Sequence, residues 1–167
     1  MRKSPATAQE IKRANGRKRK YSVIFADGSH EKIKSMKHLR QNWDVTMGLF
    51  CNGVCVGSGE LAPVTNYFSR VGTEAVSLRN PFRRKGHGLV LYLYLILMAK
   101  KLGATRIESS EALNRYSKCM WSEKLAKLFK IIGKGKCKHC KRSNFKFSID
   151  LRRTSYEEIR NMLQTKT

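Results

Sequence analysis

Acidic residues are scarce in this sequence. Among 167 residues, 12 are Asp or Glu and 35 are Lys or Arg, which gives a formal net charge of +23. Because the cations are spread along the whole chain, their field favours polyanionic partners such as nucleic acid, ribosomes, acidic cofactors or acidic membrane surfaces. The alternative explanation of the net charge is that the source proteome is generally basic. The charge alone does not decide between a polyanionic partner and a basic proteome.

Long hydrophobic runs are also missing. The longest, residues 89–99, is much shorter than the roughly 18 residues needed to cross a bilayer. The basic N-terminal residues contain no apolar segment of the kind found in secretory signals. We therefore expect a soluble, intracellular and cytoplasmic protein without a membrane partner, while its oligomeric state stays open.

The cysteine pattern does not predict a disulfide framework. Five cysteines are an odd number, and without a secreted context we expect reduced thiols. Cys137 and Cys140 form a lone C-x-x-C, and together with Cys51 and Cys55 they offer four thiolates for a structural zinc site as an alternative. Surface thiols in a basic loop are the expected state, so we expect no metal.

The order of hydrophobic patterns predicts one mixed α/β (α+β) domain. A length of 167 residues suits a single domain with its own core. We expect residues 1–20 to form a basic N-terminal arm and residues 21–167 to form the domain. Expected strands are residues 21–25, 44–51, 54–61, 71–79, 105–110 and 144–151, and expected helices are residues 7–14, 29–41, 86–102, 114–132 and 155–163.

Two basic segments, residues 17–20 and 134–142, are candidates for one positive surface. They lack evident aromatic stacking platforms, so contact with phosphates rather than recognition of bases is expected. RNA and DNA are therefore the expected macromolecular partners. For residues 17–20, a solvated and frayed terminus is the alternative.

A basic turn rich in glycine separates a predicted strand, which ends near Leu78, from a long apolar helix. Glycine lets the backbone approach a ligand closely, and the first free amides of a helix point at negative charge. A phosphate group is therefore the expected ligand of the turn. Its sequence is Arg83-Arg84-Lys85-Gly86-His87-Gly88.

In this context the hexapeptide resembles the signature of the Gcn5-related N-acetyltransferase (GNAT) superfamily. That signature has Arg or Gln, two residues, Gly, one residue, and Gly or Ala, placed between a strand and a helix. The hairpin predicted at Asn52-Gly53 and the strand at 105–110 fit the same family, and the resemblance covers roughly residues 45–125. It implies a GNAT-like acyl-CoA N-acyltransferase fold, with a central mixed, twisted sheet flanked by helices. A dinucleotide site fits less well, because a complete G-x-G-x-x-G is missing.

The resemblance implies that acetyl-CoA binds as the acyl donor. Its pyrophosphate would lie on the backbone amides of residues 84–89, and its pantetheine arm would pair with Leu78 and its neighbours like an extra strand. His87 either bonds a phosphate or is a tolerated substitution. The candidate cofactor-binding residues are Ser77, Leu78, Arg79, Arg83, Arg84, Lys85, Gly86, His87, Gly88, Leu89, Asn114 and Ser117.

Acyl transfer to an amine requires a base that removes a proton from the amine. Glu74 is the preferred base, because it lies four residues before Leu78 and is expected on the same face of the strand. An ordinary edge carboxylate is the alternative interpretation of Glu74. Glu108 and Glu111 are second choices, since they follow the next parallel strand, where open α/β sheets place their ligands.

The proton donor to sulfur is less clear from the sequence. The resemblance places the family's usual tyrosine at Trp121, whose indole cannot act as such a donor. Three alternatives stay open. Tyr116 could be the proton donor instead, the thiolate could leave without a donor, or catalysis could be impaired.

The sequence as a whole predicts an acetyl-CoA-dependent N-acetyltransferase. The charge favours an acceptor amine on or near a polyanion, such as an aminoacyl-tRNA, a modified base or a basic protein. The main alternative is a non-catalytic nucleic-acid-binding protein that retains the fold, and a zinc-stabilised DNA-binding module is a weaker one.

Overall fold

The computed structural model describes residues 5–25, 35–42, 44–64, 66–110, 113–132 and 147–166. Within these residues, seven strands form one mixed sheet in the order β1-β2-β3-β4-β5-β7-β6. The strands are β1 (Tyr21–Phe25), β2 (Val45–Cys51), β3 (Val54–Pro63), β4 (Arg70–Leu78), β5 (Arg106–Glu108), β6 (Ile131–Ile132) and β7 (Ser148–Asp150).

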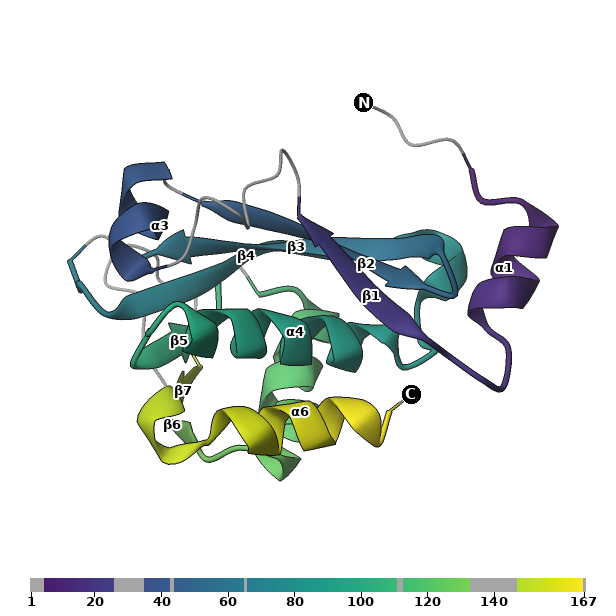
Figure 1. Cartoon of the computed structure of the whole chain (residues 1–167). Coiled ribbons are helices and arrows are strands. Elements are labelled where there is room, and N and C mark those ends of the chain that lie inside the picture. The colour runs from purple at the N-terminus through teal and green to yellow at the C-terminus, as the bar shows by residue number, and fades with distance from the viewer. Residues whose placement is uncertain are drawn as a thin grey trace.

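Five α-helices accompany the sheet in the described parts of the chain. In Figure 1, α4 runs along one face of the sheet with α6 packed against it, while α1 and α3 lie at opposite ends of the sheet. None of the helices among the described residues is both long and apolar enough to span a membrane. The helices are α1 (Ala8–Ala14), α3 (Met36–Asn42), α4 (His87–Lys101), α5 (Arg115–Cys119) and α6 (Tyr156–Gln164).

The predicted hairpin between β2 and β3 is confirmed. Cys51 pairs with Val54, and the two turn residues between them, Asn52 and Gly53, have φ angles of 49° and 77°. A two-residue turn with positive φ at both positions matches the twist of antiparallel strands, and Asn-Gly is the pair that adopts it most readily. The hairpin therefore follows from local turn chemistry.

The predicted parallel pair is also confirmed, and it is short. β4 and β5 pair only from Arg70 to Gly72 and from Arg106 to Glu108. α4 connects the two strands, as expected for a crossover between parallel neighbours. Gly103 follows α4 with a φ of 85°, and its amide donates to the carbonyl of Lys100, in agreement with its predicted role as a cap.

α4 supplies the centre of the hydrophobic core. Leu91, Leu95 and Ile96 are completely buried, and full burial of such a side chain stabilises a fold by about 1.5–3 kcal/mol. The sheet allows α4 to approach closely because β3 has a glycine beneath it. A Cβ atom at Gly59 would lie 2.9 Å from Leu95 Cδ1.

The prediction of one helix over residues 114–132 is wrong. α5 ends at Cys119 and is followed by a π-helical turn at Met120–Lys124 and a 3-10 turn at Leu125–Lys127. The chain then enters β6, where two β-branched isoleucines pair with β7. Strand pairing has thus overridden the helical spacing of the apolar residues.

Other boundaries differ from the predictions in smaller ways. The helix predicted over 29–41 is α3 at Met36–Asn42, and residues 26–34 lie outside the described parts. The strand predicted over 144–151 is β7 at Ser148–Asp150. Leu151 already begins a 3-10 turn, and its carbonyl accepts a hydrogen bond of 2.7 Å from Lys100 Nζ on α4.

Candidate active site

β4 and β5 diverge after their short parallel pairing. From residue 73 to residue 78, no strand in the described parts of the chain pairs with the edge of β4 that faces β5. β5 instead continues alongside β7, where the Ser109 amide donates to the carbonyl of Phe147. Two parallel strands that separate in this way leave backbone groups available to an extended ligand.

A β-bulge lies in the divergent half of β4. Ser58 pairs with Ser77 and Glu60 pairs with Glu74, so β4 holds one residue more than β3 across this interval. Ala75 has a φ of 45°, a conformation that non-glycine residues rarely adopt outside special turns. The bulge shifts the alternation of side chains along the strand by one position.

The bulge overturns the expectation that Glu74 and Leu78 share a face. Leu78 pairs with Gly57, whereas Glu74 pairs with Glu60, and the two β3 positions point to opposite faces. Leu78 lies on the α4 side, since its Cδ1 is 3.6 Å from a Cβ position built at Gly88. Glu74 therefore lies on the other face, directly opposite Glu60.

Two left-handed residues shape the basic turn between β4 and α4. Arg84 has a φ of 59°, and Gly86, the residue before the first turn of α4, has a φ of 90°. The Leu89 amide donates to the Gly86 carbonyl at 3.2 Å, so Leu89 is not a candidate donor to phosphate through that amide. The amides of residues 84–88 remain as the candidate donors at the start of the helix.

The arginines of the turn point in different directions. Arg83 Nε donates to the carbonyl of Leu78 at 3.1 Å, and Arg79 Nη1 donates to the carbonyl of Cys55 at 2.9 Å. Arg84 Nη2 donates to the Tyr116 hydroxyl at 3.0 Å. Arg84 therefore links the turn to α5, while Arg79 turns back towards β3.

The side chain of His87 does not face a phosphate. It is completely buried; Nδ1 lies 2.9 Å from the Tyr21 hydroxyl and Nε2 lies 3.3 Å from Asn15 Oδ1. Burial, reinforced by the charge of Arg19, lowers the pKa of His87 to about 4. The neutral ring that donates from Nε2 to Asn15 and accepts from Tyr21 satisfies both contacts. His87 is a structural residue, and only its backbone amide is available to a ligand.

Two side chains of the stretch predicted as a basic arm, Asn15 and Arg19, contact this turn, and other residues of the stretch contact the β2–β3 hairpin. Thr7 and Glu10 form a capping box at the start of α1. Arg19 Nη1 donates to the carbonyl of Lys85 at 2.6 Å, and Asn52 Nδ2 donates to the carbonyls of Arg13 and Lys18. The turn is thus supported by residues far away in sequence, for which the sequence offers no local signal.

α5 begins beside the turn, and its candidate residues are partly engaged. Asn114 Oδ1 accepts a hydrogen bond of 2.9 Å from the Ser117 amide, so Asn114 caps the helix. Tyr116 is 63% exposed, and the hydrogen bond and charge of Arg84 lower the pKa of its hydroxyl. Tyr116 therefore lies at the basic turn, where the sequence offers a phosphate site.

Trp121 is completely buried in an aromatic cluster. Its ring stacks on Phe147 with centroids 6.4 Å apart and meets the ring of Tyr92 edge-on at 5.8 Å. Burial raises the pKa of Tyr92, with a smaller opposite influence from the neighbouring Ser117 side chain, and the indole Nε1 of Trp121 has no hydrogen-bond partner among the described residues. Tyr92, on α4, is thus a protonated hydroxyl beside the position where a proton donor was expected, and the sequence analysis missed it.

The carboxylate candidates lie in different environments. Glu74 is exposed. Glu108 is 5% exposed, and its Oε1 is 3.3 Å from Arg70 Nη1. A buried carboxylate held by an arginine is poorly placed to accept a proton from a substrate, so Glu108 is a structural ion-pair partner. Glu111 lies outside the described residues.

Cys51 and Cys55 do not face a common site. Cys51 is buried, and its thiol donates to the carbonyl of Ala14; Cys55 pairs with Phe50 on the opposite face of the hairpin. A zinc site that uses both is therefore ruled out by the register. Cys137 and Cys140 lie outside the described residues, among which no group of three His, Cys, Asp or Glu side chains is arranged to hold a metal.

Solved structures share this fold. Over 79% of the chain, the structure matches an acetyltransferase of the GNAT family from Staphylococcus aureus Mu50, with a TM-score of 0.51 and 14% identity over 99% of that chain. An acetyltransferase from Bacillus subtilis in complex with CoA matches over 78% of this chain and 99% of its own, with a TM-score of 0.52 and 15% identity. No family model matches the sequence, and no curated protein matches it.

A CoA-dependent acyl-homoserine lactone synthase, BjaI, also shares the fold, with a TM-score of 0.53 and 11% identity over 72% of this chain. The chain spans 64% of the length of that synthase. The mixed sheet of this chain and the helices that flank it thus form a GNAT-like fold.

Proposed function

We propose that this protein is an acyl-CoA-dependent N-acyltransferase that uses acetyl-CoA as its donor. The observation that carries the proposal is the divergence of β4 and β5 beside a helix that begins in a basic turn. The unpaired edge of β4 suits the amide groups of a pantetheine arm, and the amides of residues 84–88 suit a pyrophosphate. Arg83 and Arg84 add positive charge at the same place.

In the proposed reaction, the acceptor amine attacks the thioester carbonyl, and the C–S bond breaks after the C–N bond forms. Glu74 takes the proton from the amine, directly or through one water. It is exposed and lies in the divergent half of β4. Glu60, directly opposite on β3, adds a second negative charge that favours a cationic acceptor.

The thiolate of CoA receives its proton from Tyr92 in this proposal. Tyr92 contacts Trp121, and burial keeps its pKa above the ordinary tyrosine value, so the hydroxyl is protonated near neutral pH. Tyr116 suits this step less well, because its hydroxyl is engaged by Arg84 at the turn. The proposed catalytic group thus consists of Glu74, with Glu60 opposite it, as the base and Tyr92 as the acid.

Calorimetry with acetyl-CoA tests the proposal most directly. We expect the wild-type protein to bind acetyl-CoA and the Gly86→Glu variant to lose binding, because a carboxylate would then face the pyrophosphate. Arg160→Glu, on the exposed face of α6, changes the net charge by two units instead of one and should bind as the wild type does. Absence of binding by the wild-type protein would refute the proposal.

A second candidate function is supported by one observation. Trp121 occupies the position expected for the acid and is fully buried, which favours a protein that keeps the fold but binds nucleic acid without catalysis. Binding of acetyl-CoA without turnover, measured by mass spectrometry across panels of amines, aminoacyl-tRNA, RNA, DNA and basic proteins, would support this candidate. A mass shift in one of those panels would identify the acceptor and would exclude this non-catalytic candidate function.

A further inference from the structure

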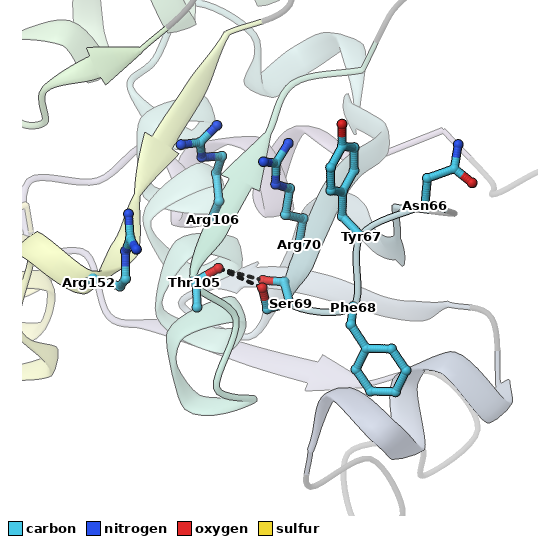
Figure 2. Close-up of a pocket in the computed structure, with 8 residues that line it drawn as sticks. All are labelled: Asn66, Tyr67, Phe68, Ser69, Arg70, Thr105, Arg106 and Arg152. Atoms are coloured by element: carbon cyan, nitrogen blue, oxygen red, sulfur yellow. Dashed lines mark hydrogen bonds between the residues drawn. The ribbon is translucent and has the colours of Figure 1, made fainter.

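A cavity lies at the other end of β4 from the basic turn. It has a volume of about 330 Å³ and is formed by the loop before β4, the starts of β4 and β5, and the turn after β7. Its floor is fixed by Thr105, whose hydroxyl donates to the carbonyl of Ser69 at 3.1 Å. Figure 2 shows its lining residues, which are Asn66, Tyr67, Phe68, Ser69, Arg70, Thr105, Arg106 and Arg152.

Three arginines and no carboxylate belong to the described lining of this cavity. Buried carboxylates behind the lining orient two of them: Arg70 pairs with Glu108 at 3.3 Å, and Arg152 donates to both oxygens of Asp150 at 2.9 and 2.6 Å. The Arg152 hydrogen bonds lower the pKa of Asp150, so that carboxylate stays ionised. Each guanidinium has five N–H donors, and these pairs leave several of them available.

Arg106 is the arginine in the middle of the cavity. It forms no hydrogen bond or ion pair through its side chain with any other described residue. In Figure 2 its guanidinium points to the same side as that of Arg70, with Tyr67 next in the row. A row of two guanidinium groups and a ring presents charge and an aromatic surface in one direction.

The aromatic residues of the loop remain open to solvent. The Arg70 guanidinium lies over the ring of Tyr67 at 3.7 Å from its centroid, yet Tyr67 is 48% exposed. Phe68 is 74% exposed and has Arg40 over its ring at 4.5 Å; in Figure 2 it points away from Tyr67. Tyr67 is therefore held by a cation on one side and is available for stacking on the other.

We propose that this cavity is a binding site for single-stranded nucleic acid. Arginine forks bind phosphate oxygens in a bidentate manner, and an exposed ring beside them stacks an unpaired base. A base paired in a duplex cannot reach Tyr67 in this way. The site is independent of the proposed acyl transfer, and it gives the net charge of +23 a defined place of contact.

Fluorescence anisotropy with a labelled 12-nucleotide oligo-U and a 12-base-pair duplex tests the proposal. We expect Arg106→Ala to weaken oligo-U binding at least fivefold and to reduce the slope of log K against log salt by about 0.7, because one phosphate contact is lost. Tyr67→Ala should weaken binding about tenfold through lost stacking, whereas Tyr67→Phe should stay within twofold of the wild type. Arg160→Ala is the matched control, since it removes the same charge from an exposed helix.

The proposal is overturned if Arg106→Ala and Tyr67→Ala bind oligo-U as tightly as Arg160→Ala does, even when the protein binds nucleic acid through other basic surfaces. It is also overturned if the protein binds the duplex as tightly as oligo-U and the Tyr67→Ala substitution changes neither of these two affinities. Thermal melts of each variant check folding. Acetyl-CoA calorimetry on the same variants should match the wild type, which separates this proposal from that of acyl transfer.

Discussion

At the scale of single residues, the pairing of Glu74 with Glu60 is the feature that ties the bulge to chemistry. Two carboxylates directly opposite each other on neighbouring strands repel, at a cost of about 0.2–1 kcal/mol. Nothing in the packing of the exposed Glu74 side chain requires the charge. The proton-accepting role proposed for Glu74 accounts for an acid at this position.

We predict that Glu74→Gln lowers kcat for acetyl transfer by about 100-fold or more, in line with the loss of a general base. Its melting temperature should be equal to or slightly above that of the wild type, because the repulsion from Glu60 is removed. Glu157→Gln, on the exposed face of α6, is the control and should leave kcat unchanged. A variant that melts earlier and loses activity in proportion would instead indicate a structural carboxylate.

Two tyrosines compete for the role of proton donor, and one substitution separates them. Tyr92→Phe should reduce kcat at least tenfold, with a smaller change in the KM for acetyl-CoA. Tyr116→Phe should act on the KM for acetyl-CoA instead, since Tyr116 bonds to Arg84 at the turn. Steady-state kinetics on both variants measures this, and the reverse pattern would assign the donor to Tyr116.

His87 predicts a pH dependence of stability. Its pKa in the folded protein is about 4, below the ordinary value of about 6.5. The unfolded chain therefore binds more protons between these values, and stability falls as the pH drops through this window. Between pH 7.5 and pH 5 the loss from this residue is about 2 kcal/mol.

The His87→Gln variant isolates that contribution. Denaturant unfolding of the wild type and the variant at pH 7.5 and pH 5 should show a difference in free energy of unfolding that narrows by about 2 kcal/mol at the lower pH. The comparison cancels the carboxylates that titrate in both proteins. A difference in free energy of unfolding that does not change with pH would mean that His87 binds the same number of protons in the folded and unfolded states.

At the scale of elements, the start of α4 depends on one left-handed glycine. Gly86 has a φ of 90°, and Gly53, in the hairpin, has a φ of 77°. Alanine at either position costs roughly 1–2 kcal/mol of backbone strain.

We predict that Gly86→Ala weakens acetyl-CoA binding at least tenfold, whereas Gly53→Ala loses similar stability but binds acetyl-CoA as the wild type does. Calorimetry and thermal melts measure the two effects, and equal affinities would show that the turn does not hold the donor.

Local chemistry made some elements predictable from the sequence. The Asn52-Gly53 turn and the glycine turn before α4 carry local sequence patterns that were sufficient to predict them, although contacts with residues 13–21 support both turns in the fold. The bulge at Ala75 depends on the register between β4 and β3, and the break after Cys119 depends on how β6 pairs. Such features arise from contacts between distant segments, which periodicity cannot reveal.

The candidate site follows the same division. Its basic turn was predicted from residues 83–88, whereas the Tyr92–Trp121 contact joins α4 to the segment after α5 and left no pattern in the sequence. His87 was placed among cofactor ligands because of its neighbours. Only the folded chain brings Tyr21 and Asn15 to its ring.

At the scale of the whole molecule, the surplus of cations acts on stability as well as on binding. A net charge of +23 repels itself in the compact state, and salt screens that repulsion. We predict that the melting temperature rises between 20 mM and 200 mM NaCl. Sodium sulfate at matched ionic strength separates general screening from specific anion binding, and a melting temperature that falls with both salts would contradict the prediction.

The contacts that hold the basic turn also bear on the order in which the protein folds. His87 meets Tyr21 across 66 positions of sequence, and Arg19 meets Lys85 across the same separation. Contacts of such separation form late, because a long loop must close before they contribute. During synthesis, residues 15–21 leave the ribosome well before their partners exist. We therefore expect the basic turn at residues 83–88 to be among the last parts of the molecule to become ordered, so that the proposed binding of acetyl-CoA becomes possible only when folding is nearly complete.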